Sequence, residues 1–183
     1  MKKEEMPYVG ITKKTPVNDA LRYGKCDKGR DCNGCSTLCQ YGSGALAEED
    51  FVPLAKHLGV SVEKLKSDYL EEIEKFGTKR FRPKLQRQRA TPYGRCIFYN
   101  EQEKCTVHGV KPLECRVATC SDHGPQLIEW FTLNFYVNPS NPDSIRAWAA
   151  KLQTHPTIPG GELHELIPNK ELLKKIMSYE VLR

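Results

Sequence analysis

The sequence predicts an α+β fold class, a mostly helical small domain with a short β-hairpin. Apolar residues recur at helical spacing in several segments, and two short β-prone pieces flank the polar turn NEQEK. Eight cysteines among 183 residues lie in two separate clusters, and in a reducing compartment cysteines bind metals more often than they form disulfides. We therefore expect the domain to be organised around a cysteine-ligated metal centre.

The composition is that of a globular protein with no membrane-spanning segment. Hydrophobic residues make up 39% of the chain and charged residues 28%, and no run approaches the ~18 apolar residues that a membrane span needs. The opening residues MKKEEMPYVG include lysines but no apolar stretch follows them, so they do not resemble a signal peptide. We expect a cytoplasmic protein that makes no contact with a membrane.

We expect three regions along the chain. Residues 1–25 contain two prolines and no sustained periodicity, which predicts an extended N-terminal segment. Residues 26–125 carry all eight cysteines and should form the metal-binding domain. Residues 126–183 should supply a C-terminal strand and helices that pack on that domain.

Two helices are expected between the cysteine clusters. Residues 47–58 (AEEDFVPLAKHL) begin with acids and are followed by Gly59, although Pro53 implies that the helix begins later or is kinked. Residues 61–76 (SVEKLKSDYLEEIEKF) have apolar side chains at helical spacing, and Gly77 would end the helix.

The second cysteine cluster lies on a predicted hairpin and a short helix. The β-prone pieces 96–99 and 105–107 each begin with a cysteine, so the hairpin should carry one cysteine at the start of each strand. Pro112 is expected to begin a short helix that holds Cys115 and Cys120.

The last part of the chain predicts one strand and two helices. Residues 126–137 (QLIEWFTLNFYV) are too short for periodicity to decide, but their β-branched and aromatic content favours a strand. Asn141, followed by proline, should begin a helix that ends near Gln153, and Asn169 should begin the last helix.

The cysteines combine local and long-range spacings. The first cluster lies in a segment rich in Gly, Asp, Asn and Ser, which predicts a loop wrapped around an ion, whereas the wider spacings of the second cluster need secondary structure to bring the sulfurs together. The candidate ligands are Cys26, Cys32, Cys35 and Cys39 in the first cluster and Cys96, Cys105, Cys115 and Cys120 in the second.

Thiolate ligands suit both iron–sulfur clusters and zinc. The irregular spacings favour an iron–sulfur cluster, 4Fe-4S, over zinc, because structural zinc is usually held by regularly paired knuckles. His108 and His123 each lie three residues after a cysteine, so either could be a ligand or an imidazole outside the ligand set.

Several motifs together resemble a known family. They are CNGCSTLC from Cys32, EED from Glu48, GRCIF from Gly94, CTVH from Cys105 and KPLECR from Lys111. In this order they resemble the cysteine-cluster family of zinc- or iron-chelating domains. The resemblance implies metal chelation by Cys32, Cys35, Cys39, Cys96, Cys105 and Cys115.

This chain departs from the family pattern at one position. The family usually ends its first motif with two adjacent cysteines, and here Leu38 occupies the first of those places. Cys26 and Cys120 lie outside the core pattern and are candidate replacements. The resemblance also supports one site shared by Cys39 and Cys115, since a site built from the first cluster alone would give the two halves no reason to share a domain.

The main functional hypothesis is a metal-binding protein with a redox or metal-handling role, whose partners are metal ions and a protein redox partner. The alternative is a zinc-stabilised enzyme that modifies protein or RNA. The sequence contains no Ser/His/Asp or paired-carboxylate motif that identifies a reaction, and we assign no catalytic residues. The acids at 48–50 and 71–74 are expected to be solvated helix faces.

A further alternative is an RNA-binding module that uses the basic segment 79–95. Phe81 and Tyr93 could stack on bases there, although such a run is more often a solvated face or compensates the charge of thiolate sites. The candidate RNA contacts are Lys79, Arg80, Arg82, Lys84, Arg87 and Arg89.

Overall fold

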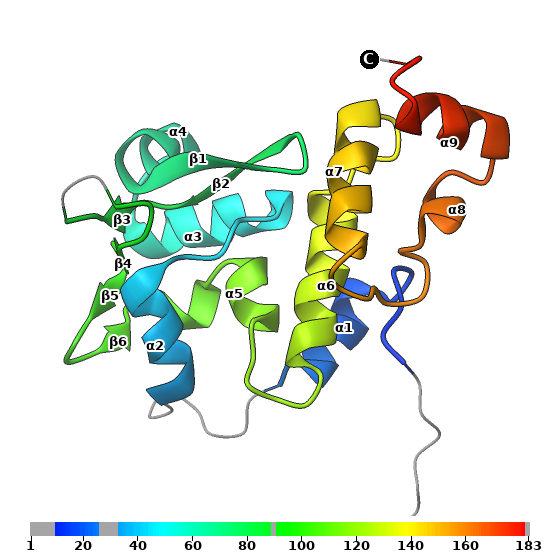
Figure 1. Ribbon diagram of the computed structural model, residues 1–183. Coiled ribbons are helices and arrows are strands. Elements are labelled where there is room, and N and C mark those ends of the chain that lie inside the picture. Colours follow the sequence, from blue (N-terminus) through cyan, green and yellow to red (C-terminus); the bar gives the residue numbers. More distant parts are fainter. Residues whose placement is uncertain (1–9, 26–32, 89–90, 182–183) are drawn as a thin grey trace, which may run out of the picture.

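The computed structural model describes residues 10–25, 33–88 and 91–181, and within them the predicted α+β fold is confirmed. The strands follow one another between the N-terminal and the C-terminal helices and form three antiparallel pairs, which are β1–β2, β3–β4 and β5–β6. Figure 1 shows the strands and α2–α4 on one side of the molecule and the C-terminal helices on the other, with α5 between them. Among the described helices, none combines the length and apolarity that crossing a bilayer would require.

The long helix predicted over 61–76 is wrong in its second half. After the short helix α4 (Val62–Lys64) and one π-helical turn (Leu65–Tyr69), the chain enters strand β1 (Leu70–Lys75). Strand β1 pairs with β2 (Thr78–Pro83), which contains the first part of the basic segment 79–95. The residues between the strands, Phe76 and Gly77, both have positive φ angles, as a tight type I′ hairpin turn requires.

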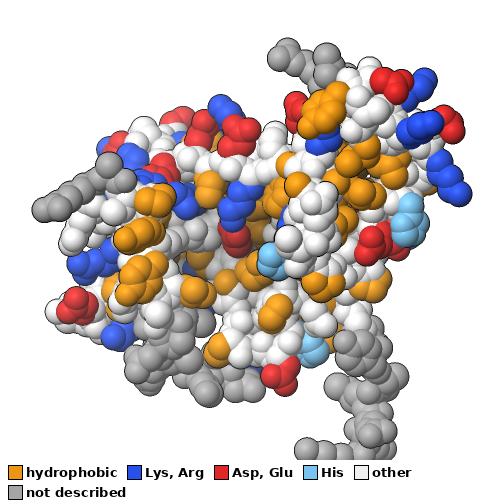
Figure 2. Space-filling view, in the orientation of Figure 1, with side chains coloured by type: hydrophobic (Ala, Val, Ile, Leu, Met, Phe, Trp, Pro, Cys, Tyr) orange, Lys and Arg blue, Asp and Glu red, His pale blue; other side chains and the backbone are white. Residues whose placement is uncertain are grey.

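Complementary charges explain why this hairpin forms against the helical pattern. The acidic strand β1 lies directly beside the basic strand β2, with Glu71 opposite Arg82 and Glu74 opposite Lys79. Figure 2 shows acidic and basic side chains mixed over this edge of the molecule. Because opposite charges across a strand pair stabilise the pairing, hydrogen bonding between the strands outweighs the helical periodicity of β1 alone.

Most of the other helices match the sequence prediction. The segment expected over 47–58 forms a 3₁₀ turn (Glu48–Asp50) followed by α3 (Phe51–Leu58), and Gly59 ends α3 in the left-handed conformation. Helices α7 (Pro142–Leu152) and α9 (Lys170–Met177) begin as predicted, because the side chains of Asn141 and Asn169 accept hydrogen bonds from the first-turn amides. The short helix α8 (Leu163–Leu166) lies between them.

Two segments are helical where the sequence predicted otherwise. The strand expected over 126–137 is wrong, since this segment lies in α6 (Gly124–Phe135), where Trp130 and Phe131 are buried. Apolar residues also lie on the exposed side of α6, where Ile128 is 36% exposed, and this weakens the amphipathic pattern that identifies a helix in a sequence. Within the N-terminal region, α1 (Val17–Tyr23) replaces the expected extended chain, and Gly24 follows its last residue.

The elements that carry cysteines differ in part from the prediction. The segment from Asn33 to Tyr41 is a helix, α2, rather than a loop. The hairpin is confirmed as β5 (Tyr99–Asn100) paired with β6 (Lys104–Cys105). The expected cysteine at the start of each strand is wrong, because Cys105 ends β6 and Cys96 belongs to β4 (Arg95–Cys96), which pairs with β3 (Leu85–Gln86). The short helix α5 (Leu113–Val117) holds Cys115 as expected, whereas Cys120 lies beyond its end.

Buried side chains form two cores. The larger core lies among α1, α5, α6, α7 and the C-terminal segments, and includes Trp130, Trp148, Leu113 and Val117. The smaller core lies around α3, β1 and the loops that carry β4–β6, and includes Cys96. Helix α5 therefore belongs to the larger core but lies next to the smaller one.

Candidate metal centre

Four cysteines from four separate elements line one cavity of about 430 Å³. They are Cys39 of α2, Cys96 of β4, Cys105 of β6 and Cys115 of α5. Cys96 is buried in the smaller core, with Cys39 and Cys105 packed against that core. Cys115 lies between two residues of the larger core, Leu113 and Val117. The cavity therefore lies where the two cores meet.

Helix α2 carries Cys39 to this cavity because α2 packs against β4, β5 and β6. The side-chain amide of Gln40 donates to the hydroxyl of Tyr99 at 3.3 Å, and the Gly94 amide donates to the Tyr41 carbonyl at 3.3 Å. These bonds join the end of α2 to the strand that holds Cys96 and to the strand that pairs with Cys105. A helix was not predicted for this segment because the Gly, Asn and Ser around its cysteines are typical of turns.

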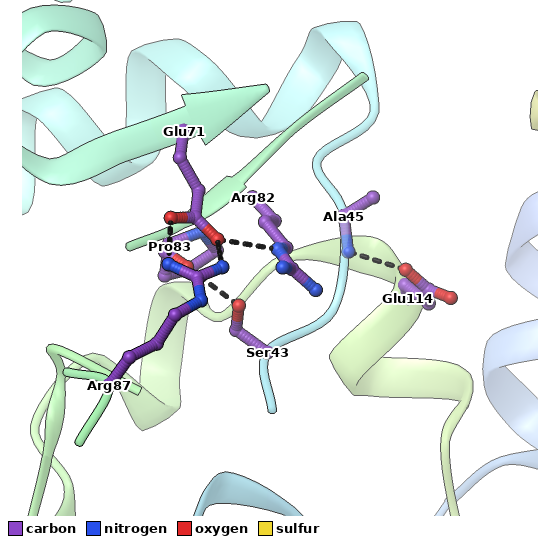
Figure 3. A network of polar contacts seen from close by, with 7 residues as sticks. All are labelled: Ser43, Ala45, Glu71, Arg82, Pro83, Arg87 and Glu114. Carbon is purple, nitrogen blue, oxygen red and sulfur yellow. Dashed lines mark hydrogen bonds and ion pairs between the residues drawn. The ribbon is translucent and has the colours of Figure 1, made fainter. Parts of the chain in front are cut away.

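The chain that leaves α2 binds α5 through two successive residues and binds β2 through the residue before them. The backbone N–H of Gly44 donates to the sulfur of Cys115 at 3.3 Å, and the N–H of Ala45 donates to the carboxylate of Glu114. The hydroxyl of Ser43 donates to the carbonyl of Pro83 at 2.6 Å, so the same loop also contacts β2. Figure 3 shows Ser43 and Ala45 between the strand end and α5.

Gly44 has no side chain because the sulfur of Cys115 occupies the space that a side chain would need. A Cβ atom there would lie 2.7 Å from that sulfur and 2.8 Å from the backbone nitrogen of Cys115, closer than real Cβ contacts allow. The glycine lets a backbone N–H reach the sulfur directly. An N–H donor at this position would stabilise a thiolate in a metal centre.

A buried carboxylate, that of Asp50, holds the beginning of α5. Asp50 is 5% exposed, and its oxygens accept hydrogen bonds from the N–H of Ala47 at 2.8 Å, the N–H of Leu113 at 2.7 Å and the guanidinium of Arg116 at 2.8 Å. The expectation that the acids at 48–50 are a solvated face is therefore wrong for Asp50. No spacing in the sequence indicated this role, because the partners of Asp50 in α5 lie more than 60 residues away.

Two of the cavity thiols, those of Cys96 and Cys115, are expected to be neutral when no metal is bound. Burial raises the pKa of Cys96 to about 12 and also raises the pKa of Cys115, and the neighbouring Cys39 raises both further. Because a metal ligand is the thiolate, a positive ion at this site must displace protons as it binds. The thiolate forms of these buried cysteines are therefore favoured only when a cation lies beside them.

The remaining candidate ligands are placed differently. Cys120 is exposed and is not among the residues that line the cavity. Cys26 and Cys32 lie outside the described residues, and so does the side chain of Cys35, although Cys35 falls within α2. Within the described part of the chain, no three His, Cys, Asp or Glu side chains are placed so that they could hold an ion as they stand.

The two candidate histidines also differ. His108 lines the cavity, in a short 3₁₀ turn (His108–Val110) between β6 and α5. His123 lies at the beginning of α6, where its ring contacts the ring of Tyr23 at 5.2 Å between centroids and its Nδ1 lies 3.4 Å from the side-chain oxygen of Gln126.

Most of the basic residues proposed to contact RNA are bound within the protein. Arg82 and Arg87 both form ion pairs with the carboxylate of Glu71 (Figure 3). The hydrogen bond from Arg87 is the main cause of the lowered pKa of Glu71. Three other basic residues of the segment also donate hydrogen bonds within the protein: Lys79 to Glu72, Arg80 to the Phe135 carbonyl and Lys84 to the Ser67 carbonyl. Arg89 lies outside the described residues. The contacts of this segment therefore favour a structural role in the β1–β2 hairpin over a role in binding RNA.

Comparison with known proteins gives one match. A search of curated proteins and a search of solved structures find no similar chain. The family model "CxxCxxCC: Putative zinc- or iron-chelating domain" matches residues 31–136, a range that contains the four cavity cysteines. Because this match covers more than half of the 183 residues, the chain belongs to the CxxCxxCC family, whose domain is one of zinc or iron chelation.

Proposed function

We propose that this protein binds an iron–sulfur cluster of the 4Fe-4S type through cysteine thiolates, with a redox or metal-handling role. The observation that carries the proposal is the convergence of Cys39, Cys96, Cys105 and Cys115 on one cavity from four separate elements. Cysteines that only fill a core have no reason to gather, and this gathering joins residues up to 76 positions apart in the sequence.

The chemistry of the cavity fits such a group. Four thiolates are the usual ligand set of a 4Fe-4S cluster, and the Gly44 amide is placed to donate to one of the sulfurs. Apolar side chains including Phe98 and Val107 complete the walls. Since a water molecule occupies roughly 30 Å³ in the liquid, a volume of about 430 Å³ leaves room for a group of several heavy atoms.

Zinc is the alternative occupant, since four thiolates also bind it in a tetrahedral site. A single zinc ion would require the sulfurs to close to about 2.3 Å from one point, and the described cysteines do not hold an ion as they stand. Either occupant could recruit Cys26, Cys32 or Cys35 as further ligands, so these three remain proposed ligands. Cys120 is exposed and does not line the cavity, so we propose that it is not a ligand.

Metal analysis after purification without oxygen tests the proposal. The protein should be brown, with iron and acid-labile sulfide in comparable amounts, because thiolate-to-iron charge transfer absorbs visible light and zinc, being d¹⁰, does not. A colourless protein with stoichiometric zinc would reverse the choice of metal. A protein free of both metals would refute the metal centre.

The shared site is tested by serine substitutions. Cys39→Ser and Cys115→Ser should each remove as much metal as the double variant, since losing one ligand of a four-thiolate site already releases or converts the metal and residues that act as a unit are not additive. Cys120→Ser is the matched control, because Cys120 is exposed and does not line the cavity. Loss of half the metal in each single variant and all of it in the double would place Cys39 and Cys115 in separate sites.

The role of the Gly44 amide is tested by Gly44→Ala. The added methyl group would contact the sulfur of Cys115 and push the loop away, so metal should pass to a chelator about 10-fold faster than from the parent, in line with other residues that support metal ligands. Gly109→Ala is the control, since Gly109 lies near the cavity in an ordinary conformation with nothing within 4 Å of an added Cβ. Equal release rates in the two variants would refute the role of Gly44.

A further inference from the structure

Arg116 follows Cys115 in α5 and lines the same cavity. Its guanidinium donates through one terminal nitrogen, Nη2, to the buried carboxylate of Asp50 at 2.8 Å. Its Nε atom is buried and has no hydrogen-bond partner among the described residues, although the side chain as a whole is 36% exposed. The arginine is therefore fixed at one end, while a second donor of the same rigid group is unused.

A buried donor without an acceptor needs an explanation. Native proteins pair most of their buried polar groups, because leaving a donor unpaired is unfavourable, and more so for a charged group. Arg116 also lines the same cavity as four cysteines, which lose their protons when a metal binds. A sulfur of the bound metal centre is an acceptor that the protein alone does not supply.

Charge leads to the same partner. Four thiolates around a core of charge +2 carry a net charge of about −2 in a weakly solvated cavity. The Asp50 carboxylate compensates part of the arginine charge, but Asp50 also accepts two backbone N–H bonds, from Ala47 and Leu113, that share its negative charge. Asp50 therefore does not fully neutralise the guanidinium, and the remaining positive charge can stabilise the negatively charged sulfurs.

We propose that Arg116 is a positioning and charge-compensating residue of the metal centre, whose Nε–H donates to a sulfur of that centre while Asp50 holds the guanidinium in place. This inference rests on the proposed function, since it requires a thiolate centre in the cavity. Hydrogen bonds to sulfur and net charge are two of the factors that set the reduction potential of an iron–sulfur cluster. Arg116 therefore stabilises the reduced, more negative state.

The test compares Arg116→Gln and Arg116→Lys with the parent protein, all purified without oxygen with their metal. If the centre is iron–sulfur, Arg116→Gln should move the midpoint potential to more negative values, by about a tenfold change in the ratio of reduced to oxidised protein, or roughly 59 mV for a one-electron couple. Arg116→Lys keeps the charge but not the planar Nε–H donor, so it should restore part of the shift.

If the centre contains zinc, the same proteins are loaded with cobalt(II). The sulfur-to-cobalt absorption of Arg116→Gln should then move to longer wavelength, because a sulfur that has lost a hydrogen bond is a better electron donor. Arg146→Gln is the matched control in both cases. Arg146 also pairs with an aspartate, Asp143, and binds backbone carbonyls, but it lies on α7 and does not line the cavity.

The outcomes separate the two proposals. A parent protein without bound metal refutes the proposed function. A loaded parent whose potential or absorption is the same in Arg116→Gln and Arg146→Gln refutes the role of Arg116 alone. If Arg116→Gln does not retain its metal, Arg116→Lys decides: a shifted signal supports the Nε–H donor, and a signal equal to that of the parent refutes it.

Discussion

The carboxylate of Asp50 holds together the two parts of the protein that supply the cavity cysteines. It is buried, and it accepts hydrogen bonds from its own turn, from the first amide of α5 and from Arg116. A buried carboxylate that loses such partners is strongly destabilised, so these contacts fix where α5 begins. Because Cys115 lies one residue away from Arg116 and two from Leu113, the position of its sulfur depends on this carboxylate.

A metal at the junction of the two cores would act as a cross-link between them. Cys96 lies in the smaller core and Cys115 in a helix of the larger core, so an ion or cluster bound to both would join segments that otherwise meet through polar contacts. Structural zinc contributes about 10–16 kcal/mol in small domains, compared with a net stability of about 5–15 kcal/mol for a typical domain. Binding of this strength would couple metal content to the folding of the whole chain.

The sequence predicted the features that depend on local chemistry. The caps at Asn141 and Asn169, the hairpin that ends at Cys105 and the short helix that holds Cys115 are all set by nearby side chains. The family resemblance is confirmed. The shared site of Cys39 and Cys115 remains a prediction, and the lining of one cavity by both supports it.

The failures depend on distant partners. Strand β1 was predicted as helix because its apolar spacing is helical, and only the basic strand that follows makes it a strand. Helix α6 has a weak amphipathic pattern because apolar residues lie on its exposed side as well as in the core. The roles of Asp50 and Gly44 depend on contacts with residues 63 and 71 positions away, respectively, which no local pattern encodes.

The most direct test of the account is X-ray absorption at the edge of the bound metal, measured on protein isolated without oxygen. A thiolate metal centre predicts a first shell made of sulfur alone, at about 2.3 Å, with iron neighbours beyond it if the centre is a cluster. Cys115→Ser should alter this shell, whereas Cys120→Ser should leave it unchanged. A first shell of nitrogen and oxygen, or a sulfur shell that Cys115→Ser does not alter, would contradict the claim that the two cores meet at a thiolate metal centre.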